Sequence, residues 1–365
     1  MQIKAAVFRK PHEPLTIESV EIDKPAGREV LVRTAATGVC HSDLHVVDGQ
    51  GRWPLDRPIV LGHEGAGVVE SVGADVTTLR PGDHVVACLS GFCGSCAQCL
   101  AGHPNLCVGG LVTRPDGAPP RLSQRGEPLR QFIGISSYAE HMLLHENSVV
   151  KIDPELPLDR AALVGCGVLT GVGAALRTSG LQAGQTVAVF GCGGVGLAII
   201  QGARIGGARQ IIGVDVFDGK LEMATRVGAT HVVNSTQDDP VKAVRALTKG
   251  AGVDHAFEAV GNATLVRQAI ESLAIRGTAT IVGVLPPDAM IEFPWMAIRP
   301  ECRVQTSRMG SNRFRLDIPL YLEFYRQGRL LLDEMVTRRG RLEDINDAFR
   351  AMKAGEVART VLTFD

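Results

Sequence analysis

From about Leu169 onward, short apolar strands alternate with segments of helical period. The apolar runs are QTVAVF, QIIGVD, THVVN, VDHAFEAV and TATIVGV, and segments such as KLEMATRVGA and PVKAVRALTKG separate them. Parallel neighbouring strands need a long crossover connection, which is usually a helix. The alternation therefore predicts an α/β unit with a parallel sheet covered by helices on both faces.

The chain before about Leu144 has a different texture. Brief β-branched runs, such as VLVRTAAT, GAGVVESVG and DHVVA, are interrupted by Gly, Pro and Asp. This pattern predicts a barrel-like β domain with long loops. Residues 108–137, rich in Gly, Pro and Arg, are expected to be an irregular insertion. From about Gly310 we expect two helical segments and a final strand, ARTVLTF, that returns to the first domain.

The composition excludes several classes of partner. Of 365 residues, 38 are basic and 39 are acidic, a balance that argues against nucleic-acid or membrane-surface binding. Lys4 comes too early for the apolar core of a signal peptide, and the longest apolar stretch, residues 186–200, is too short to span a bilayer. We therefore expect a cytoplasmic protein. In that reducing compartment, nine cysteines indicate metal binding or catalysis rather than disulfides.

One short loop contains four cysteines in a C-x2-C-x2-C-x7-C run: Cys93, Cys96, Cys99 and Cys107. Four thiolates at this spacing can surround one zinc ion with no coordination position left open. Such a closed site is structural, because neither water nor substrate can reach the metal. Chance spacing or two disulfides is the alternative.

A glycine-rich turn, GCGGVG, follows the strand QTVAVF and precedes the helix-like segment VGLAIIQGARIGG. In this strand–turn–helix context the turn predicts a dinucleotide site at Gly191, Gly193, Gly194 and Gly196. The first glycine permits the tight turn, the second lets a pyrophosphate approach the backbone, and the last packs helix against strand. The helix N-terminus offers free N–H groups to the phosphates.

Asp215 ends the next strand, IIGVD. A carboxylate at this position hydrogen-bonds the ribose hydroxyls and repels a 2′-phosphate, which favours NAD over NADP. Lys220 is near enough in sequence to reach the same ribose, although it could equally be a solvated lysine.

A second set of metal-type residues is scattered along the chain: Cys40 in GVCHSD, His63 and Glu64 in GHEGAG, and Cys166 in GCGVLTG. Each lies in a glycine-flanked turn. Two thiolates and one imidazole form a three-ligand zinc set that leaves a fourth position open. Cys166 could instead be a buried packing residue.

Together, GVCHSD, GHEGAGVVESVG, the four-cysteine loop and GCGGVG resemble the zinc-dependent medium-chain alcohol dehydrogenases, over almost the whole chain. The resemblance implies a GroES-like, β-barrel-type catalytic domain in residues 1–168, completed by residues 309–365, and a Rossmann domain in residues 169–308. The insertion after Cys107 is similar to that of the animal-type and glutathione-dependent classes, which are usually homodimers.

The resemblance also implies roles for individual residues. Cys40, His63 and Cys166 match the catalytic zinc ligands, Glu64 matches a carboxylate that can approach the metal, and Asp43 would accept the other N–H of His63.

Further positions match parts of the family's relay and cofactor site. Ser42 and His45 correspond to the proton relay from the bound alcohol to solvent. Thr170 and Val195 correspond to positions behind the nicotinamide ring, and Arg359 corresponds to a pyrophosphate contact.

The chain departs from the family pattern at two places. His41 replaces an arginine often found beside the first zinc cysteine, which weakens one phosphate contact or makes it pH-dependent. Leu111 stands where the glutathione-dependent branch tends to carry arginine, although Arg114 is close by in sequence.

These features lead us to expect two zinc ions per chain, NAD, and an enzyme that reversibly oxidises primary alcohols, with secondary alcohols left open as further substrates. One alternative is an S-(hydroxymethyl)glutathione dehydrogenase. Another is a dehydrogenase that retains its nicotinamide and passes electrons to a different acceptor. A non-catalytic zinc- and nucleotide-binding protein fits less well, because it would not need Cys40, Ser42, His45, His63 and Cys166 together.

Overall fold

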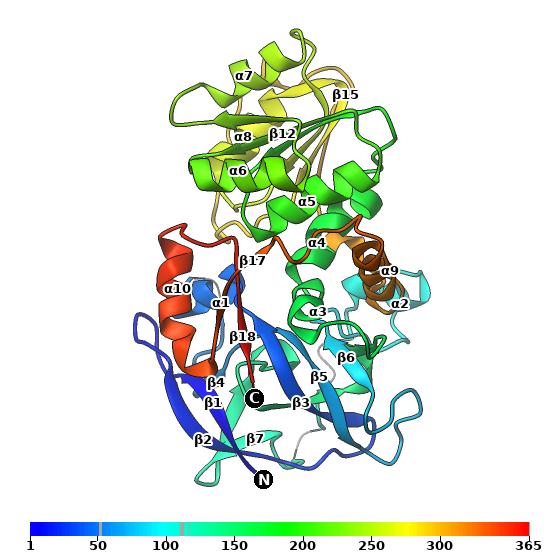
Figure 1. Cartoon of the computed structure of the whole chain (residues 1–365), viewed down its shortest axis with the longest axis vertical. Helices are drawn as coiled ribbons and strands as arrows, with labels where there is room; N and C mark the ends of the chain where they lie inside the picture. The colour runs from blue at the N-terminus through cyan, green and yellow to red at the C-terminus, as the bar shows by residue number, and fades with distance from the viewer. Residues whose placement is uncertain (51–52, 110–112, 116, 365) are drawn as a thin grey trace. The chain divides into compact units, whose positions relative to one another are not determined.

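A computed structural model describes residues 1–50, 53–109, 113–115 and 117–364 (Figure 1). The chain forms two units. Unit 1 comprises Met1–Cys166, Arg313–Phe324 and Val336–Asp365, and unit 2 comprises Gly167–Asn312 and Tyr325–Met335. The domain boundaries expected at residues 168/169 and 308/309 remain a prediction.

Unit 1 contains a closed β-barrel, as the GroES-like expectation required. Its strands, in order around the barrel, are β1 (Gln2–Phe8), β2 (Thr16–Ile22), β7 (Leu122–Gln124), β8 (Glu127–Gln131) and β4 (Ile59–Val60). Buried aliphatic side chains from these strands, among them Ile3, Val20 and Leu122, fill one of the cores of this unit. The predicted β-rich first domain is therefore confirmed.

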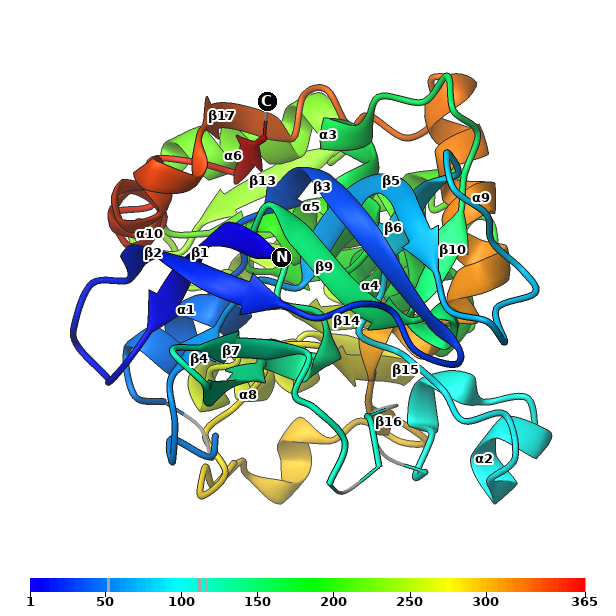
Figure 2. The same cartoon turned by 90° about the horizontal axis from the view of Figure 1, so that it is seen from below.

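Unit 1 also contains a second sheet, which carries the buried residues Glu64 and Arg359. Its strands are β10 (Val149–Lys151), β6 (His84–Ala87), β5 (Glu64–Val72), β3 (Glu29–Gly38), β18 (Arg359–Thr363) and β17 (Val336–Gly340), with β9 (His141–His145) also paired to β3. Figure 2 shows β3, β5 and β6 side by side. Because β18 pairs antiparallel with β3, the end of the chain returns to the first domain, as the ARTVLTF run predicted.

The expectation for residues 108–137 was partly wrong. Their second half forms β7 and β8, an antiparallel hairpin that completes the barrel. Arg125 and Gly126 both have positive φ, at 52° and 83°, as a tight hairpin turn requires. The strands are so short that their alternation is hard to distinguish from loop sequence.

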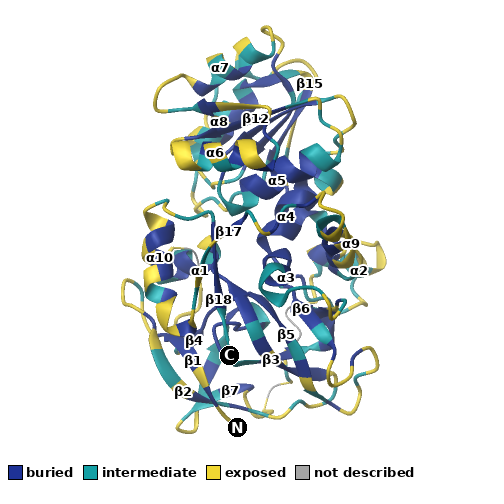
Figure 3. Cartoon of the chain, viewed as in Figure 1, coloured by how far each residue is buried: buried dark blue, intermediate teal, exposed yellow. Residues whose placement is uncertain are grey.

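Unit 2 is built on one parallel sheet, which confirms the Rossmann prediction. Its strand order is β13 (His231–Asn234), β12 (Gln210–Asp215), β11 (Thr186–Phe190), β14 (Val253–Glu258), β15 (Leu273–Ile281) and β16 (Arg303–Thr306). The central strands are buried along their length (Figure 3). The edge strand β16 was not predicted from the sequence, because its residues RVQT are largely exposed and contain no apolar run.

Four helices connect the strands of this sheet: α5 (Gly194–Ile205), α6 (Asp218–Val227), α7 (Pro240–Leu247) and α8 (Ala263–Glu271). α5 contacts α6, and α7 contacts α8. Because parallel crossovers are right-handed, the reversal of strand order after β13 puts these two pairs on opposite faces of the sheet. α4 (Gly167–Gly173) packs on α5, where a Cβ at Gly171 would lie 2.5 Å from that of Ala198.

The remaining helices are α1 (His41–Val47), α2 (Ala97–Leu100), α3 (Leu158–Val164), α9 (Phe314–Arg326) and α10 (Ile345–Lys353). Among the described residues, no single helix has the length and apolar character needed to cross a membrane. One bent pair, Leu158–Val164 with Gly167–Thr178, passes on length and composition alone.

Candidate active site and metal centres

The four cysteines of the loop converge on one point. Their sulfur atoms lie 3.5 Å apart for Cys96 and Cys99, 3.6 Å for Cys93 and Cys107, 3.9 Å for Cys96 and Cys107, and 4.0 Å for Cys93 and Cys99. A zinc ion with four Zn–S bonds of about 2.3 Å requires sulfur–sulfur edges of about 3.8 Å. The sulfur positions therefore fit a tetrahedral thiolate site.

Backbone amides lower the pKa of Cys93 and of Cys96 in this loop and so favour their thiolate forms. The N–H of Cys93 donates to Sγ of Cys107, and the N–H of Cys96 donates to Sγ of Cys93, both at 3.3 Å. Backbone N–H groups of Cys99 and Val108 lower the pKa of Cys96 to about 6. All nine cysteines are free, so the disulfide alternative is not what the structure shows.

The scattered set also comes together, inside unit 1. Cys40 precedes α1, His63 and Glu64 begin β5, and Cys166 lies between α3 and α4. Their ligand atoms all lie within 4.8 Å of one another, and all four residues are buried. The fold therefore assembles two thiols, an imidazole and a carboxylate from three distant segments.

His63 shows which of its atoms is available for a metal. Its Nδ1 lies 3.2 Å from the carboxylate of Asp43, whereas its Nε2 is buried and makes no hydrogen bond among the described residues. A buried nitrogen without a partner is costly unless something binds it. The donor set and this orphaned nitrogen fit zinc held by Cys40, His63 and Cys166.

Asp43 was expected to brace His63, and a further residue, Tyr138, was not foreseen. The Tyr138 hydroxyl donates to Oδ2 of Asp43 at 2.9 Å, and the N–H of Gly62 donates to Oδ1 at 2.9 Å. Tyr138 stands 95 residues from Asp43 in sequence. No local motif could have revealed this contact.

Glu64 forms an ion pair with Arg359, so its carboxylate is not free to act simply as a metal ligand. Its Oε2 accepts a hydrogen bond from Nη2 of Arg359, the first residue of β18. Burial raises the pKa of Glu64 to about 7, although the charge of Arg359 opposes the shift. Gly38, between them in the sheet, has no side chain to collide with Oε2 of Glu64. Arg359, expected to contact a pyrophosphate, therefore already has an internal partner.

The predicted proton relay lies on one helix. Ser42 Oγ is 3.9 Å from Sγ of Cys40, and His45 follows three residues later, partly exposed. His41, at the start of the same helix, is exposed. This spacing puts Ser42 and His45 on one face of α1, leading outward from the metal-type group.

The glycine turn in unit 2 has the shape that a dinucleotide needs. Gly191 has φ of +96°, and a Cβ at Gly196 would overlap the carbonyl oxygen of Gly191. In contrast, a Cβ at Gly193 would meet no atom within 4 Å. Gly191 and Gly196 are thus required by the fold, whereas Gly193 leaves open backbone where phosphates could approach. Gly194 and Val195 begin α5 beyond it.

Asp215 lies beside this turn. Its Oδ2 accepts from the N–H of Cys192 at 2.7 Å, and its Oδ1 accepts from the N–H groups of Val216 and Phe217. Lys220 places its Nζ 4.7 Å from the ring centre of Phe217. Thr170, also in unit 2, is buried and donates to Sδ of Met309.

Arg114, which could have kept glutathione recognition open, is used elsewhere. It donates to Asp23, to Glu29, and to the carbonyl groups of Lys24 and Pro119. Leu111, the other position of interest, lies outside the described residues.

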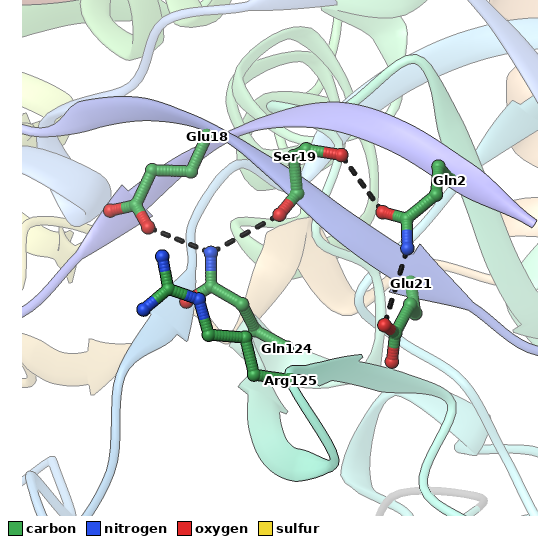
Figure 4. Close-up of a pocket in the computed structure, with 6 residues that line it drawn as sticks. All are labelled: Gln2, Glu18, Ser19, Glu21, Gln124 and Arg125. Atoms are coloured by element: carbon green, nitrogen blue, oxygen red, sulfur yellow. Dashed lines mark hydrogen bonds between the residues drawn. The ribbon is translucent and has the colours of Figure 1, made fainter.

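A hollow on the barrel surface offers no comparable chemistry (Figure 4). Its side chains bond chiefly to one another: Gln124 donates to Glu18 and to the carbonyl of Ser19, and Gln2 bonds Ser19 and Glu21. Arg125 completes the lining.

Comparisons with known proteins agree with this geometry. Residues 26–154 match the family described as "Alcohol dehydrogenase GroES-like domain", and residues 194–325 match "Zinc-binding dehydrogenase". A Saccharomyces cerevisiae S-(hydroxymethyl)glutathione dehydrogenase is 39% identical over 372 residues, covering 99% of this chain and 96% of that protein.

Two solved structures are also similar over the whole chain. An alcohol dehydrogenase zinc-binding domain protein from Burkholderia ambifaria has a TM-score of 0.94 and 39% identity, covering 100% of this chain and 99% of that one. Benzyl alcohol dehydrogenase from Acinetobacter calcoaceticus has a TM-score of 0.92 and 32% identity, with complete coverage of both. With two zinc-type residue groups and a Rossmann NAD(P)-binding unit, the chain belongs to the zinc-binding medium-chain alcohol dehydrogenase family of oxidoreductases.

Proposed function

We propose that this enzyme uses zinc and NAD to oxidise the hydroxymethyl group of S-(hydroxymethyl)glutathione to the corresponding thioester. The proposed zinc-dependent dehydrogenase reaction rests on the buried group of Cys40, His63 and Cys166, in which Nε2 of His63 makes no hydrogen bond among the described residues. The substrate rests on the yeast relative, which has this activity in its name and matches nearly the whole chain. The comparisons thus favour the alternative over the free alcohols that the sequence led us to expect first.

Cys40, His63 and Cys166 would hold the catalytic zinc, with Glu64 nearby. When bound there, zinc supplies a Lewis acid that makes the substrate hydroxyl more acidic. Ser42, close to Cys40, would accept the hydroxyl proton, and His45 would deliver it toward solvent. Cys93, Cys96, Cys99 and Cys107 would hold the structural zinc.

NAD, the hydride acceptor, would lie on the glycine turn. Gly191, Gly193, Gly194 and Gly196 would hold the pyrophosphate, and Asp215 with Lys220 would bind the adenosine ribose. Thr170 and Val195 would lie behind the nicotinamide.

The substrate assignment is tested by NADH formation from NAD and formaldehyde, with and without glutathione. An absolute requirement for glutathione supports the proposal. Turnover of free primary alcohols at equal or greater kcat/KM, with no gain from glutathione, would contradict it.

Free primary alcohols, aromatic ones included, are the second candidate. Arg114 is committed to Asp23 and Glu29, so it is not poised to bind a glutathione carboxylate. The ring of Trp53 packs on Phe132 at 4.8 Å, and Phe132 in turn meets His63 at 5.7 Å. This aromatic row leads from the surface to a zinc ligand, and benzyl alcohol belongs in the substrate series.

The cofactor choice has its own test. Replacing Asp215 by Gly and Val216 by Arg should shift the NADP/NAD preference, measured as a ratio of kcat/KM, by about 100-fold, because the repulsion of the 2′-phosphate is removed. Since Asp215 also accepts three backbone N–H groups, Asp215→Asn is the matched control for lost stability. Unchanged NAD selectivity in the double variant would refute the assignment.

We also propose that two copies of the chain pair through the edge of the unit 2 sheet. Among the described strands β16 lies at the edge, and the preceding loop exposes Met290, Trp295 and Met296, the last two by 80% and 82%. Edge strands and exposed apolar groups of this kind are usually covered. Sedimentation should give a dimer that Trp295→Ser with Met296→Ser weakens, and a monomeric wild-type chain would contradict the proposal.

A further inference from the structure

Tyr138 is a fully buried tyrosine whose hydroxyl points at the residue that braces a metal-type histidine. We propose that Tyr138 is a positioning residue for His63 that acts through Asp43 by fixing the carboxylate that holds the imidazole. The inference rests on the proposed catalytic zinc site. Neither the sequence motifs nor the proposed relay gives Tyr138 a role.

The backbone of Tyr138 is tied to the turn that carries His63. Its N–H donates to the carbonyl of Leu61 at 3.1 Å, and its carbonyl accepts from the N–H of Ala6 at 2.9 Å. A Cβ at Gly62, whose φ is +89°, would lie 2.5 Å from the nitrogen of Tyr138. The two segments therefore approach as closely as a glycine permits.

The ring of Tyr138 is held equally firmly. It packs edge-to-face on Phe349 of α10, with ring centres 6.3 Å apart, inside a buried cluster that includes Phe8 and Leu61. A ring in such a cluster cannot turn without disturbing its neighbours. The packing of the ring therefore fixes the position of the hydroxyl.

At this position the hydroxyl donates a hydrogen bond to Oδ2 of Asp43. Asp43 has no solvent exposure, so its oxygens depend on protein donors. Oδ1 receives the N–H of Gly62 at 2.9 Å, and Oδ2 receives the Tyr138 hydroxyl at 2.9 Å. With one donor on each oxygen, the plane of the carboxylate is set.

The orientation of His63 follows from that of the carboxylate. Nδ1 of His63 lies 3.2 Å from both oxygens of Asp43, which fixes the tautomer that leaves Nε2 with its lone pair toward Cys40 and Cys166. Among the described residues, loss of the Tyr138 hydroxyl would leave Oδ2 with no donor except His63. The carboxylate of Asp43 could then rotate, and the imidazole of His63 would be held less firmly in the orientation that turns Nε2 toward Cys40 and Cys166.

The test is Tyr138→Phe, which removes one oxygen atom and keeps the packed ring. The variant is dialysed against a graded series of zinc-chelator concentrations, and the zinc bound per chain is measured. Catalytic zinc should be lost at a chelator concentration about 10-fold lower than in wild type. A loss of metal affinity of about 10-fold is the smallest effect typical of residues that hydrogen-bond to a metal ligand. The visible absorption of the enzyme with Co²⁺ in that site should shift, because its ligand geometry changes. The zinc of the four-cysteine loop should be retained as in wild type.

Tyr325→Phe is the matched control, because Tyr325 also donates to an aspartate, Asp333, but at an exposed position in unit 2. It should change neither readout. Adding Asp43→Asn to Tyr138→Phe should weaken zinc binding no more than Asp43→Asn alone, since both changes break the same linkage.

Three results would overturn the inference: an unchanged zinc affinity and Co²⁺ spectrum in Tyr138→Phe, losses that add in the double variant, or equal loss of both zinc ions. A wild-type chain that binds only one zinc would instead overturn the proposed function.

Discussion

The two metal-type groups of this chain both contain cysteine thiols, but they lie in opposite surroundings. The four-cysteine group is confined to residues 93–107, is half-exposed, and draws its order from a single loop. The group of Cys40, His63 and Cys166 is buried and comes from distant segments; Asp43 holds His63, and β5, which begins directly after His63, pairs with β3. A local group depends on its metal for order, whereas a distributed group is ordered by the fold before the metal arrives.

The largest effect expected from this contrast is in the loop. Cys99→Ser should lower the free energy of opening residues 93–107 by about 4 kcal/mol or more, because the zinc that orders them is lost. Hydrogen exchange of the loop amides measures this value. Cys302→Ser, a half-buried cysteine outside both groups, is the control. A loop as protected as in wild type would show that the metal does not order it.

The distributed group should respond in the opposite way. Cys166→Ser should reduce turnover on the order of 10³-fold, since the Lewis acid contributes several kcal/mol to the barrier, while loop protection stays unchanged. Steady-state kinetics and hydrogen exchange on the same variant separate the two effects. Cys88→Ala, a buried cysteine of neither group, should leave turnover intact. Loss of loop protection in Cys166→Ser would break the comparison.

The segment after the four-cysteine loop depends on charge rather than on metal. Glu29, 4% exposed, accepts from Arg114 and Arg121, which both follow Cys107 in sequence. Burial acts to raise the pKa of Glu29, but hydrogen bonds from Arg114, the Ala26 amide and Arg121 lower it below its ordinary value. Stability from this carboxylate is therefore present above its unfolded pKa and is lost as pH falls through the lower folded pKa.

Glu29→Gln should accordingly destabilise unit 1 by about 3 kcal/mol at pH 7, because the buried Arg121 loses its carboxylate partner and Arg114 keeps only Asp23. The difference from wild type in urea unfolding should shrink steadily below about pH 4.5. Glu70→Gln, a surface carboxylate paired with His141, is the control. A penalty that does not change between pH 7 and pH 3 would mean that the charge of Glu29 is not what holds the segment.

The smallest expected effect concerns the proposed proton relay, which leads from the group of Cys40, His63 and Cys166 toward solvent. His45→Ala should lower turnover about tenfold at low pH and little at high pH, where bulk base replaces the imidazole. The pH profile of kcat measures this, with His12→Ala, outside the relay, as control. A loss independent of pH would refute the relay through Ser42 and His45.

The sequence identified the local features directly. The four cysteines, the GCGGVG turn with Asp215, and the strand–helix alternation were all readable, because each depends on residues close together in the chain. It missed β16 and the β7–β8 hairpin, since exposed or very short strands carry no periodic signal. It named Cys40, His63 and Cys166 through a family resemblance, because their spacing alone could not have united them.

What the sequence by itself determined is therefore the chemistry available: which thiolates, imidazoles and glycines the chain has, and which of them are neighbours. Only the tertiary structure decided that Arg359 pairs with Glu64, that Arg114 is bound to Asp23 and Glu29, and that Tyr138 supports Asp43. These contacts join residues 85 to 295 positions apart. At such separations it is the pairing of strands and the packing of the core that choose partners, and buried polar groups must then be satisfied by whatever the fold brings beside them.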